Sequence, residues 1–216
     1  MASIRPRVLI ADDHRMLADA FSRILSDEYD VVGIVSDGRA LVEQAPQLAP
    51  DAILLDISMP KLNGLDAARE LKSMLPDVAL VIITMHGDPQ VAANAQLAGA
   101  SGFVTKSAAA SELKAALKTV LEGGSYLTPL VSSEGVDKFL RRATKRRGAR
   151  LTPRQRQVLQ LLAEGLSMKQ VGYELDLSTR TIQHHKYKIM EEQGIDSNAG
   201  LVQLAIELHL IDPPAP

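Results

Sequence analysis

Acidic side chains stand at two points of the N-terminal half where a short apolar run ends. Asp12 and Asp13 follow the run Val8–Ala11, and Asp56 follows the run Ala52–Leu55. If these runs are strands of a parallel sheet, their carboxyl ends lie at one edge, which is where such folds bind ligands. Carboxylates that share one place repel one another. Such a cluster therefore predicts a site for a hard divalent cation such as Mg²⁺, which takes oxygen ligands.

Two further side chains extend this predicted site. Thr84 follows the apolar run Val78–Ile83, and Lys106 follows the short run Gly102–Val104. A lysine binds phosphoryl oxygens as a point charge, and a threonine hydroxyl can bond to the same group. Phosphoryl transfer depends chiefly on positioning and charge neutralisation, and a carboxylate can be its nucleophile. The residues together predict a phosphoryl-accepting site, whereas a dinucleotide site would need a glycine-rich motif where this chain reads ADDH.

Residues 1–128 alternate between apolar runs and helical patterns. The expected helices cover about 14–26, 38–48, 65–75, 89–98 and 108–121. Continuous apolar strands that alternate with amphipathic helices predict a parallel sheet covered on both faces. We therefore expect an α/β domain of the flavodoxin-like (βα)5 type. In its strand order 2-1-3-4-5, numbered along the chain, the ligand site lies between strands 1 and 3.

The C-terminal part shows short helical stretches and no strand pattern. Residues that favour helix starts precede the four stretches: Thr152, Ser167, Ser178 and Ser197. The first two begin capping boxes, with Gln three residues later. We therefore expect a small all-α domain of four helices over residues 151–216, joined to the first domain by a basic and partly helical linker over residues 129–150.

The segment 167–190 reads as a helix, a short turn and a second helix. In the second helix the 3.6-residue period places Ile182, His185 and Ile189 on one face. Another face carries side chains long enough to reach base edges in a DNA major groove: Arg180, Gln183, His184 and Tyr187. A solvated helix surface would show the same spacing, so spacing alone leaves both interpretations open.

Composition and charge further limit the possible functions and partners of the chain. The net charge of −2 for 216 residues divides into −5 over residues 1–128 (11 basic, 16 acidic) and +3 over residues 129–216 (13 basic, 10 acidic). The basic half suits a nucleic-acid partner. The absence of cysteine excludes disulfide scaffolds, thiolate metal sites and cysteine nucleophiles. With no apolar run long enough for a membrane span and no signal peptide, we expect a cytoplasmic protein without a membrane partner.

Four segments together resemble the receiver domain of two-component response regulators. They are VLIADDH (8–14), LLDISMP (54–60), ITMHG (83–87) and GASGFVTK (99–106). The resemblance implies that a sensor histidine kinase donates a phosphoryl group to Asp56. The implied Mg²⁺ ligands are Asp12, Asp13, Asp56 and the backbone carbonyl of Ser58. The other implied roles are switch hydroxyl for Thr84, phosphate-binding lysine for Lys106 and switch aromatic for Phe103, where many receivers have Tyr.

The C-terminal sequence RLTPRQRQVLQLLAEGLSMKQVGYELDLSTRTIQHHKYKIMEEQGI resembles the LuxR-type helix-turn-helix of the NarL/FixJ subfamily. The residues that this resemblance places toward bases are Gln183, His184 and Tyr187. Those placed at the phosphate backbone are Lys169, Arg180, Thr181, His185 and Lys188. The last expected helix, about 198–209, has an apolar stripe that is either core or a dimer surface: Leu201, Leu204, Ala205 and Leu208.

Several positions depart from the pattern of that family. It commonly has Glu at positions 155 and 157, Asn at 168, Lys or Arg at 183 and Lys-Leu at 192–193, where this chain has Gln155, Gln157, Met168, Gln183, Glu192 and Gln193. The loss of a cation at 183 and the acids at 191 and 192 are expected to weaken DNA binding or to change the DNA sequence that is read.

The resemblance predicts a transcription regulator that is not a turnover enzyme. Phosphorylation is expected to shift it from a closed form, with the recognition helix covered, to a homodimer that binds double-stranded DNA and works with RNA polymerase. One alternative is a DNA-binding regulator that is independent of phosphorylation and uses the receiver as a dimerisation module. Another is a metal-dependent phosphatase, which would need a second catalytic acid where Ser58 stands.

Overall fold

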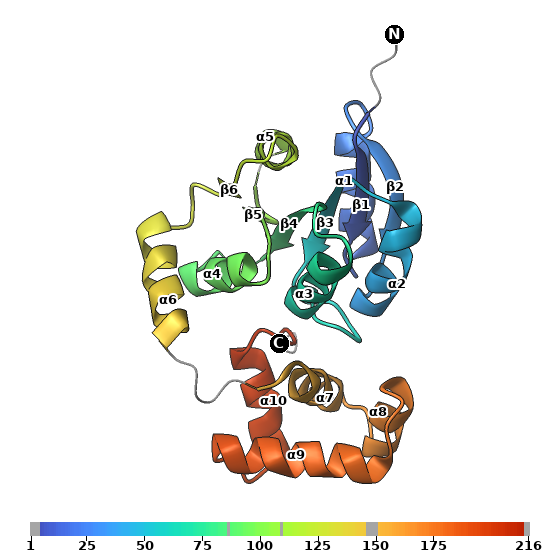
Figure 1. The fold of residues 1–216 in the computed structure, drawn as a ribbon, viewed down its shortest axis with the longest axis vertical. Helices are drawn as coiled ribbons and strands as arrows, with labels where there is room; N and C mark the ends of the chain where they lie inside the picture. Colours follow the sequence, from blue (N-terminus) through green and yellow to red (C-terminus); the bar gives the residue numbers. More distant parts are fainter. Residues whose placement is uncertain (1–4, 86, 109, 146–150, 214–216) are drawn as a thin grey trace.

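The N-terminal half of the chain folds around a parallel sheet (Figure 1). The computed structural model describes residues 5–85, 87–108, 110–145 and 151–213. The six strands, in the spatial order β2-β1-β3-β4-β5-β6, are β1 (Arg7–Ala11), β2 (Asp30–Val35), β3 (Ala52–Asp56), β4 (Ala79–Thr84), β5 (Gly102–Thr105) and β6 (Tyr126–Leu127). The predicted flavodoxin-like order is confirmed, and the short β6, which pairs with β5, extends it.

Helices cover both faces of this sheet. They are α1 (Arg15–Leu25), α2 (Gly38–Leu48), α3 (Gly64–Met74), α4 (Pro89–Leu97) and α5 (Ala110–Leu121). Successive strand residues point to opposite faces, so the buried side chains form two clusters. Val8 and Ile10 of β1 pack with α1 and α5, whereas Leu9 and Ala11 pack with α2, α3 and α4. Burial on both faces fixes the strands, and it places their carboxyl ends at one edge of the sheet.

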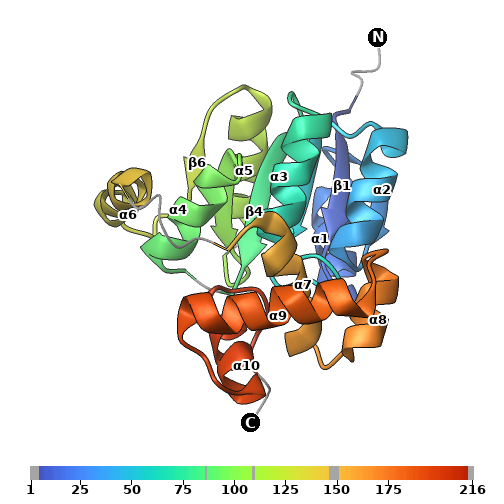
Figure 2. The same cartoon turned by 60° about the horizontal axis from the view of Figure 1, so that its bottom comes forward.

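A further helix, α6 (Ser133–Lys145), packs against α4 (Figures 1 and 2). Val136 is buried in the core cluster on the α4 side, and Phe139 and Leu140 pack against the same cluster. Gly135 allows the close approach, because a Cβ atom there would lie 2.8 Å from Cγ of Pro89. Residues 146–150 of the expected basic linker lie outside the described residues.

The C-terminal part is a bundle of short helices: α7 (Pro153–Ala163), α8 (Met168–Glu174), α9 (Thr179–Gln193) and α10 (Asn198–Glu207). Both predicted capping boxes are present, because Thr152 and Ser167 each accept a hydrogen bond from the third helical amide and the Gln side chain there bonds back to the cap amide. Ile182 and Ile189 of α9 are fully buried. Within the described ranges, no helix combines the length and apolar character needed to cross a membrane.

Candidate functional site

The acidic residues predicted from the sequence meet at the carboxyl edge of the sheet. Asp12 follows β1 and Asp56 ends β3, and both are almost fully buried. Ligand atoms of Asp12, Asp13, His14 and Asp56 all lie within 4.8 Å of one another. His14, which the sequence analysis does not assign to the metal set, joins the group because its Nδ1 lies 2.9 Å from Oδ1 of Asp13. The cluster is therefore of a kind that could hold a metal ion.

Lys106 links the two buried carboxylates. Its Nζ donates a hydrogen bond to Oδ2 of Asp56 at 2.8 Å and lies 2.9 Å from Oδ2 of Asp12. Burial raises the pKa of Asp56 to about 6, and Lys106 opposes this rise while Asp12 and Asp13 add to it. Burial acts to lower the pKa of Lys106, but its contacts with Asp56 and Asp12 outweigh burial and raise that pKa. The site thus keeps a charged ammonium beside the buried carboxylates.

Thr84 and Phe103 occupy different positions around this cluster. Thr84 ends β4 and is buried, and its backbone carbonyl accepts a hydrogen bond from the Lys106 amide at 2.8 Å. The ends of β4 and β5 therefore hold Thr84 and Lys106 together. Phe103 of β5 is buried in the core cluster on the side of α2, α3 and α4. It lies in the hydrophobic core, where repacking would affect α4.

The loop between β3 and α3 folds tightly back on the end of β3. The Ile57 amide donates to Oδ1 of Asp56 at 2.8 Å, and the Gly64 amide donates to the Ile57 carbonyl at 2.8 Å. A Cβ atom on Gly64 would lie only 1.9 Å from the Asp56 carbonyl oxygen. Glycine is therefore required where α3 begins, and the geometry of Asp56 depends on this loop.

The helix α9 presents most of its predicted DNA-contacting side chains to solvent. Those that are exposed are Arg180, Gln183, His184, Tyr187 and Lys188, and Lys169 on α8 is exposed as well. Thr181 is half-buried, and its hydroxyl shares a 2.8 Å hydrogen bond with Ser178 at the start of the helix. His185 is half-buried, and burial, followed by its charged neighbours, lowers its pKa. The exposed side chains lie opposite the buried Ile182 and Ile189.

Two departures from the family pattern contact each other in the structure. Nε2 of Gln155 donates a hydrogen bond to Oε2 of Glu192 at 3.0 Å. The family commonly has Glu and Lys at these positions, which would pair by charge. Here an amide bonds to a carboxylate instead, and this hydrogen bond ties α7 to α9.

The apolar stripe of α10 divides between two environments. Leu201 and Ala205 are buried in the domain core with Leu159 and Ile189, and Leu204 and Leu208 pack partly against it. The expectation of a dimer surface is therefore wrong for Leu201 and Ala205, because these side chains already fill the core of their own domain. Helical periodicity predicts such a stripe but not which surface covers it.

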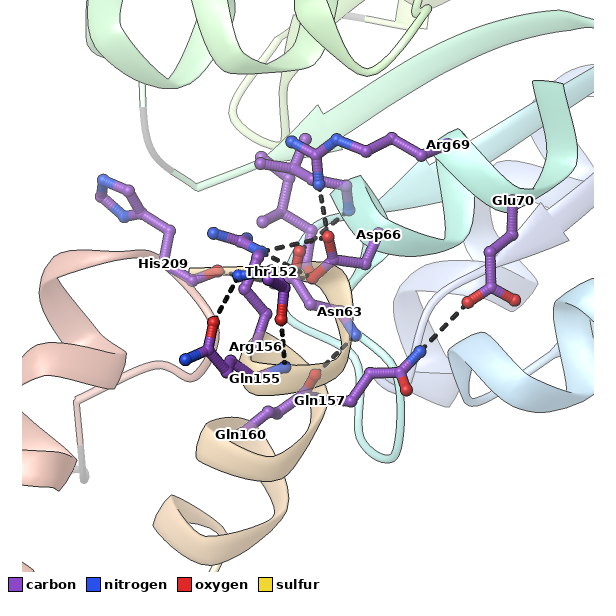
Figure 3. Close-up of polar contacts among 12 residues, drawn as sticks. Asn63, Asp66, Arg69, Glu70, Thr152, Gln155, Arg156, Gln157, Gln160 and His209 are labelled. Carbon is purple, nitrogen blue, oxygen red and sulfur yellow. Dashed lines mark hydrogen bonds and ion pairs between the residues drawn. The ribbon is translucent and has the colours of Figure 1, made fainter. Parts of the chain in front are cut away.

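The helix α7 and residues 209–212 contact the receiver half (Figures 1 and 3). Nε of Arg156 lies 3.1 and 3.0 Å from the two carboxylate oxygens of Asp66 on α3, and Nε2 of Gln157 donates to Glu70 at 3.1 Å. The backbone amide of Asn63, at the start of α3, donates a hydrogen bond to Oε1 of Gln160 at 2.8 Å. We call these contacts, with those of residues 209–212, the interdomain seam.

The seam uses a different surface from the one expected. A closed form with a covered recognition helix is not what the structure contains, because α7 and α10 lie between α9 and the receiver and the outer face of α9 is exposed (Figures 1 and 2). No sequence motif marks the seam residues as partners of the receiver half. Gln157 is the one departure from the family pattern that fits the seam, because the Glu common at this position would face Glu70 with a like charge.

Comparisons with known proteins agree with these two halves. Residues 8–118 match the response regulator receiver domain, and residues 149–205 match the family of bacterial regulatory proteins named luxR. The chain is 35% identical over 199 residues to the transcriptional regulatory protein UhpA of Escherichia coli (strain K12), covering 91% of this chain and 95% of UhpA.

Solved structures of the RcsB response regulator show the same likeness. One from Salmonella typhimurium is 27% identical, with a TM-score of 0.65, and the match covers 94% of this chain and 98% of that chain. An RcsB–DNA complex is 26% identical, with a TM-score of 0.55 and coverage of 93% and 97%. The chain therefore belongs to the response regulators that join a receiver domain to a LuxR-type helix-turn-helix.

Proposed function

We propose that this protein is a transcription regulator that accepts a phosphoryl group on Asp56 and reads double-stranded DNA with α9. The observation that carries the proposal is the contact of the buried Asp56 with Lys106 Nζ at 2.8 Å, beside Asp12, with the Lys106 backbone amide bonded to the carbonyl of Thr84. A carboxylate nucleophile, a fixed cation and a hydroxyl group are the protein groups that phosphoryl acceptance needs. The sensor histidine kinase is the proposed donor.

The donor set fits Mg²⁺. Asp12, Asp13 and Asp56 offer carboxylate oxygens, the ligands that this ion prefers, and their ligand atoms lie within the same 4.8 Å group. These three residues would hold the ion, together with the backbone carbonyl of Ser58. Bound Mg²⁺ would neutralise the negative charge of the phosphoryl group and of the carboxylates.

The transfer step follows from the position of Asp56. A carboxylate oxygen of Asp56 attacks phosphorus of the donor phosphohistidine, the nitrogen–phosphorus bond breaks, and the leaving imidazole nitrogen takes up a proton. Lys106 neutralises phosphoryl oxygens from the side of β5, and the Thr84 hydroxyl can bond to one of them. The product is an acyl phosphate whose phosphoryl group carries a charge of about −1.5 to −2. Because the new bond removes the charge of the Asp56 carboxylate, the net charge at this edge of the sheet becomes more negative by about one unit.

Labelling with a small phosphodonor tests this assignment. With phosphoramidate and Mg²⁺, we expect one phosphoryl group per chain on a phosphate-affinity gel, because Asp56 is the one proposed acceptor of the site. Removal of Mg²⁺ with a chelator should reduce labelling to background, since the clustered carboxylates would then repel the donor. Equal labelling with and without Mg²⁺ would contradict the metal assignment. Absence of labelling under all conditions would favour the receiver as a phosphorylation-independent dimerisation module.

The DNA-reading surface is supported by exposure and charge. The outer face of α9 carries Gln183, His184 and Tyr187 for base edges. Arg180 and Lys188 on α9 and Lys169 on α8 are exposed cations for phosphates. The RcsB–DNA complex is a similar protein bound to DNA. Pairing on two half-sites requires a homodimer. RNA polymerase is the further partner proposed for a regulator of this kind.

A salt titration tests the phosphate contacts. Arg180→Ala should lower the slope of log binding constant against log salt concentration by about 0.9, because one fewer counterion is released from the DNA. Arg23→Ala on α1, an exposed arginine of the receiver half, is the matched control and should leave the slope unchanged. An unchanged slope in Arg180→Ala would remove this residue from the DNA interface. Fluorescence anisotropy with a labelled duplex measures both.

A further inference from the structure

The contacts that dock the helix-turn-helix domain on the receiver half come from one face of α7 and from residues 209–212. Arg156, Gln157 and Gln160 of α7 bond to α3 and to the loop before it. In the part of the chain that the structure describes, no hydrogen bond or ion pair joins α9 to the receiver half. Docking therefore uses none of the α9 side chains that are proposed to read DNA.

The helix α7 separates α9 from the receiver. One face of α7 packs on α9, because Val158 and Leu161 share a core cluster with Ile182. The helical period of 3.6 residues places Arg156 and Gln160 on the opposite face of α7, which meets the receiver. Packed helices lie about 8–10 Å apart, and a helix with its side chains has a radius of about 5–6 Å. The outer surface of α9 therefore lies about 15 Å from the axis of α7, on the side away from the receiver.

The outer face of α9 is open in this arrangement. Gln183, His184 and Lys188 are exposed, and 55% of Tyr187 is exposed. Figure 1 shows α9 at the end of the molecule that lies away from the sheet, and in Figure 2 α9 lies in front of α7. A DNA major groove admits a helix of this kind. A duplex can therefore approach α9 from that end while the domain stays docked.

The acidic receiver is far enough from this face for its charge to be screened. Residues 1–128 carry a net charge of −5, which repels a duplex. The Debye length is about 8 Å at physiological ionic strength and about 30 Å at about 0.01 M. The layer formed by α7 and α9 is thicker than the first length and thinner than the second. Repulsion by a docked receiver should therefore be weak at physiological ionic strength and appear only at low salt.

We propose that the docked protein binds a single DNA half-site as a monomer, through α9 and with the interdomain seam intact. The proposal rests on the proposed reading of DNA by α9. It differs from the closed form expected from the sequence, in which docking would cover the recognition helix. Binding of one half-site then needs neither undocking nor phosphorylation, and the receiver reaches DNA in its docked state.

The first experiment holds the seam closed. The chain has no cysteine, so Glu70→Cys with Gln157→Cys, whose native side chains bond at 3.1 Å, can be joined by a short bis-maleimide. The matched control is the same variant capped with a mono-maleimide. The probe is a duplex with one half-site, taken from sequences that the wild type selects from a random pool. At about 0.15 M ionic strength, fluorescence anisotropy should give dissociation constants for the joined and capped proteins within about fivefold of each other, the lower end of typical coupling between sites.

The joined protein should bind through the same face as the capped one. Gln183→Ala should weaken binding to the half-site duplex by about fivefold or more, the effect of one lost base contact. The factor should be the same in the joined and the capped protein. A loss in the capped protein alone would show that the joined protein binds DNA through another surface, which would overturn the proposal.

The second experiment measures the reciprocal effect. Coupling between two sites is reciprocal, so a duplex that required undocking would slow the joining of the two introduced cysteines. Saturating half-site duplex should instead leave the rate of joining unchanged. The rate at which a mono-maleimide caps Asp27→Cys, an exposed position of the receiver half, is the control for a general effect of DNA on the reagent.

Two failures can be told apart. Weakening of half-site binding by more than about fivefold on joining, or slower joining in the presence of the duplex, would overturn docked binding and leave α9 as the DNA reader. Selection of no sequence by the wild type, with no binding of duplex DNA by the joined or the capped protein, would overturn the proposed reading of DNA and docked binding together.

Discussion

Asp56→Asn is expected to abolish acyl-phosphate formation. An amide nitrogen or oxygen does not replace a carboxylate as the nucleophile, so labelling by phosphoramidate with Mg²⁺ should fall about a thousandfold or more. Asp27→Asn, an exposed residue before β2, is the matched control and should be labelled like the wild type. The measurement is a phosphate-affinity gel, with the acid and alkali lability typical of an acyl phosphate as a second criterion.

The same variant should keep its fold. Burial already raises the pKa of Asp56, so the structure does not depend on its ionised form, and Lys106 keeps its ion pair with Asp12 at 2.9 Å. We expect the thermal midpoint to move by about 4 °C at most. A folded Asp56→Asn protein that is still labelled at the wild-type rate would show that another residue is the acceptor, and the assignment of the whole site would be wrong.

Gly64→Ala is expected to be strongly destabilising. The added Cβ atom would lie 1.9 Å from the Asp56 carbonyl oxygen and 2.9 Å from its carbon, and backbone atoms at that distance cannot move aside as a side chain can. The start of α3 and the end of β3 must separate, which should lower the free energy of unfolding by about 3 kcal/mol or more. Urea denaturation followed by circular dichroism measures the loss.

Gly33→Ala on β2 is the control for this prediction. Its Cβ atom would meet two leucine methyl groups at 3.2 Å, which can adjust, so the change in unfolding free energy should stay below about 1 kcal/mol. Where Gly64→Ala remains folded at low temperature, acyl-phosphate formation should still be slower, because the loop that positions Asp56 has moved. Equal stability of the two variants would show that the β3–α3 junction is looser than its geometry indicates.

The sheet and the acidic site follow closely from local sequence. Runs such as Ile53–Leu55 are apolar throughout because both faces of the strand are covered, and this signal predicts a parallel sheet without further information. Once the strand order is known, acids at the ends of β1 and β3 must meet. The strand β6 is too short for a periodic signal and becomes visible only through its pairing with β5.

The interdomain seam does not follow from local sequence. Arg156 and Asp66 are 90 positions apart, and Gln160 and Asn63 are 97 apart, so no local period relates them. Arg and Gln on one face of a short helix are ordinary surface residues in any pattern analysis. Their partners are defined only by the packing of two complete domains, which explains why the sequence predicts a covered α9 and the structure instead contains a docked α7.

The packing of α6 on α4 sets the length of the connection between the domains. Because α6 ends at Lys145 and α7 begins at Pro153, only residues 146–152 separate them, and even a fully extended chain of that length spans about 25 Å. A tether this short keeps an undocked helix-turn-helix domain at an effective concentration in the millimolar range near its receiver. Weak contacts therefore suffice to hold it docked, and this equilibrium does not change on dilution. The proposed pairing of two chains on DNA does depend on dilution, so docking and pairing can be separated by protein concentration alone.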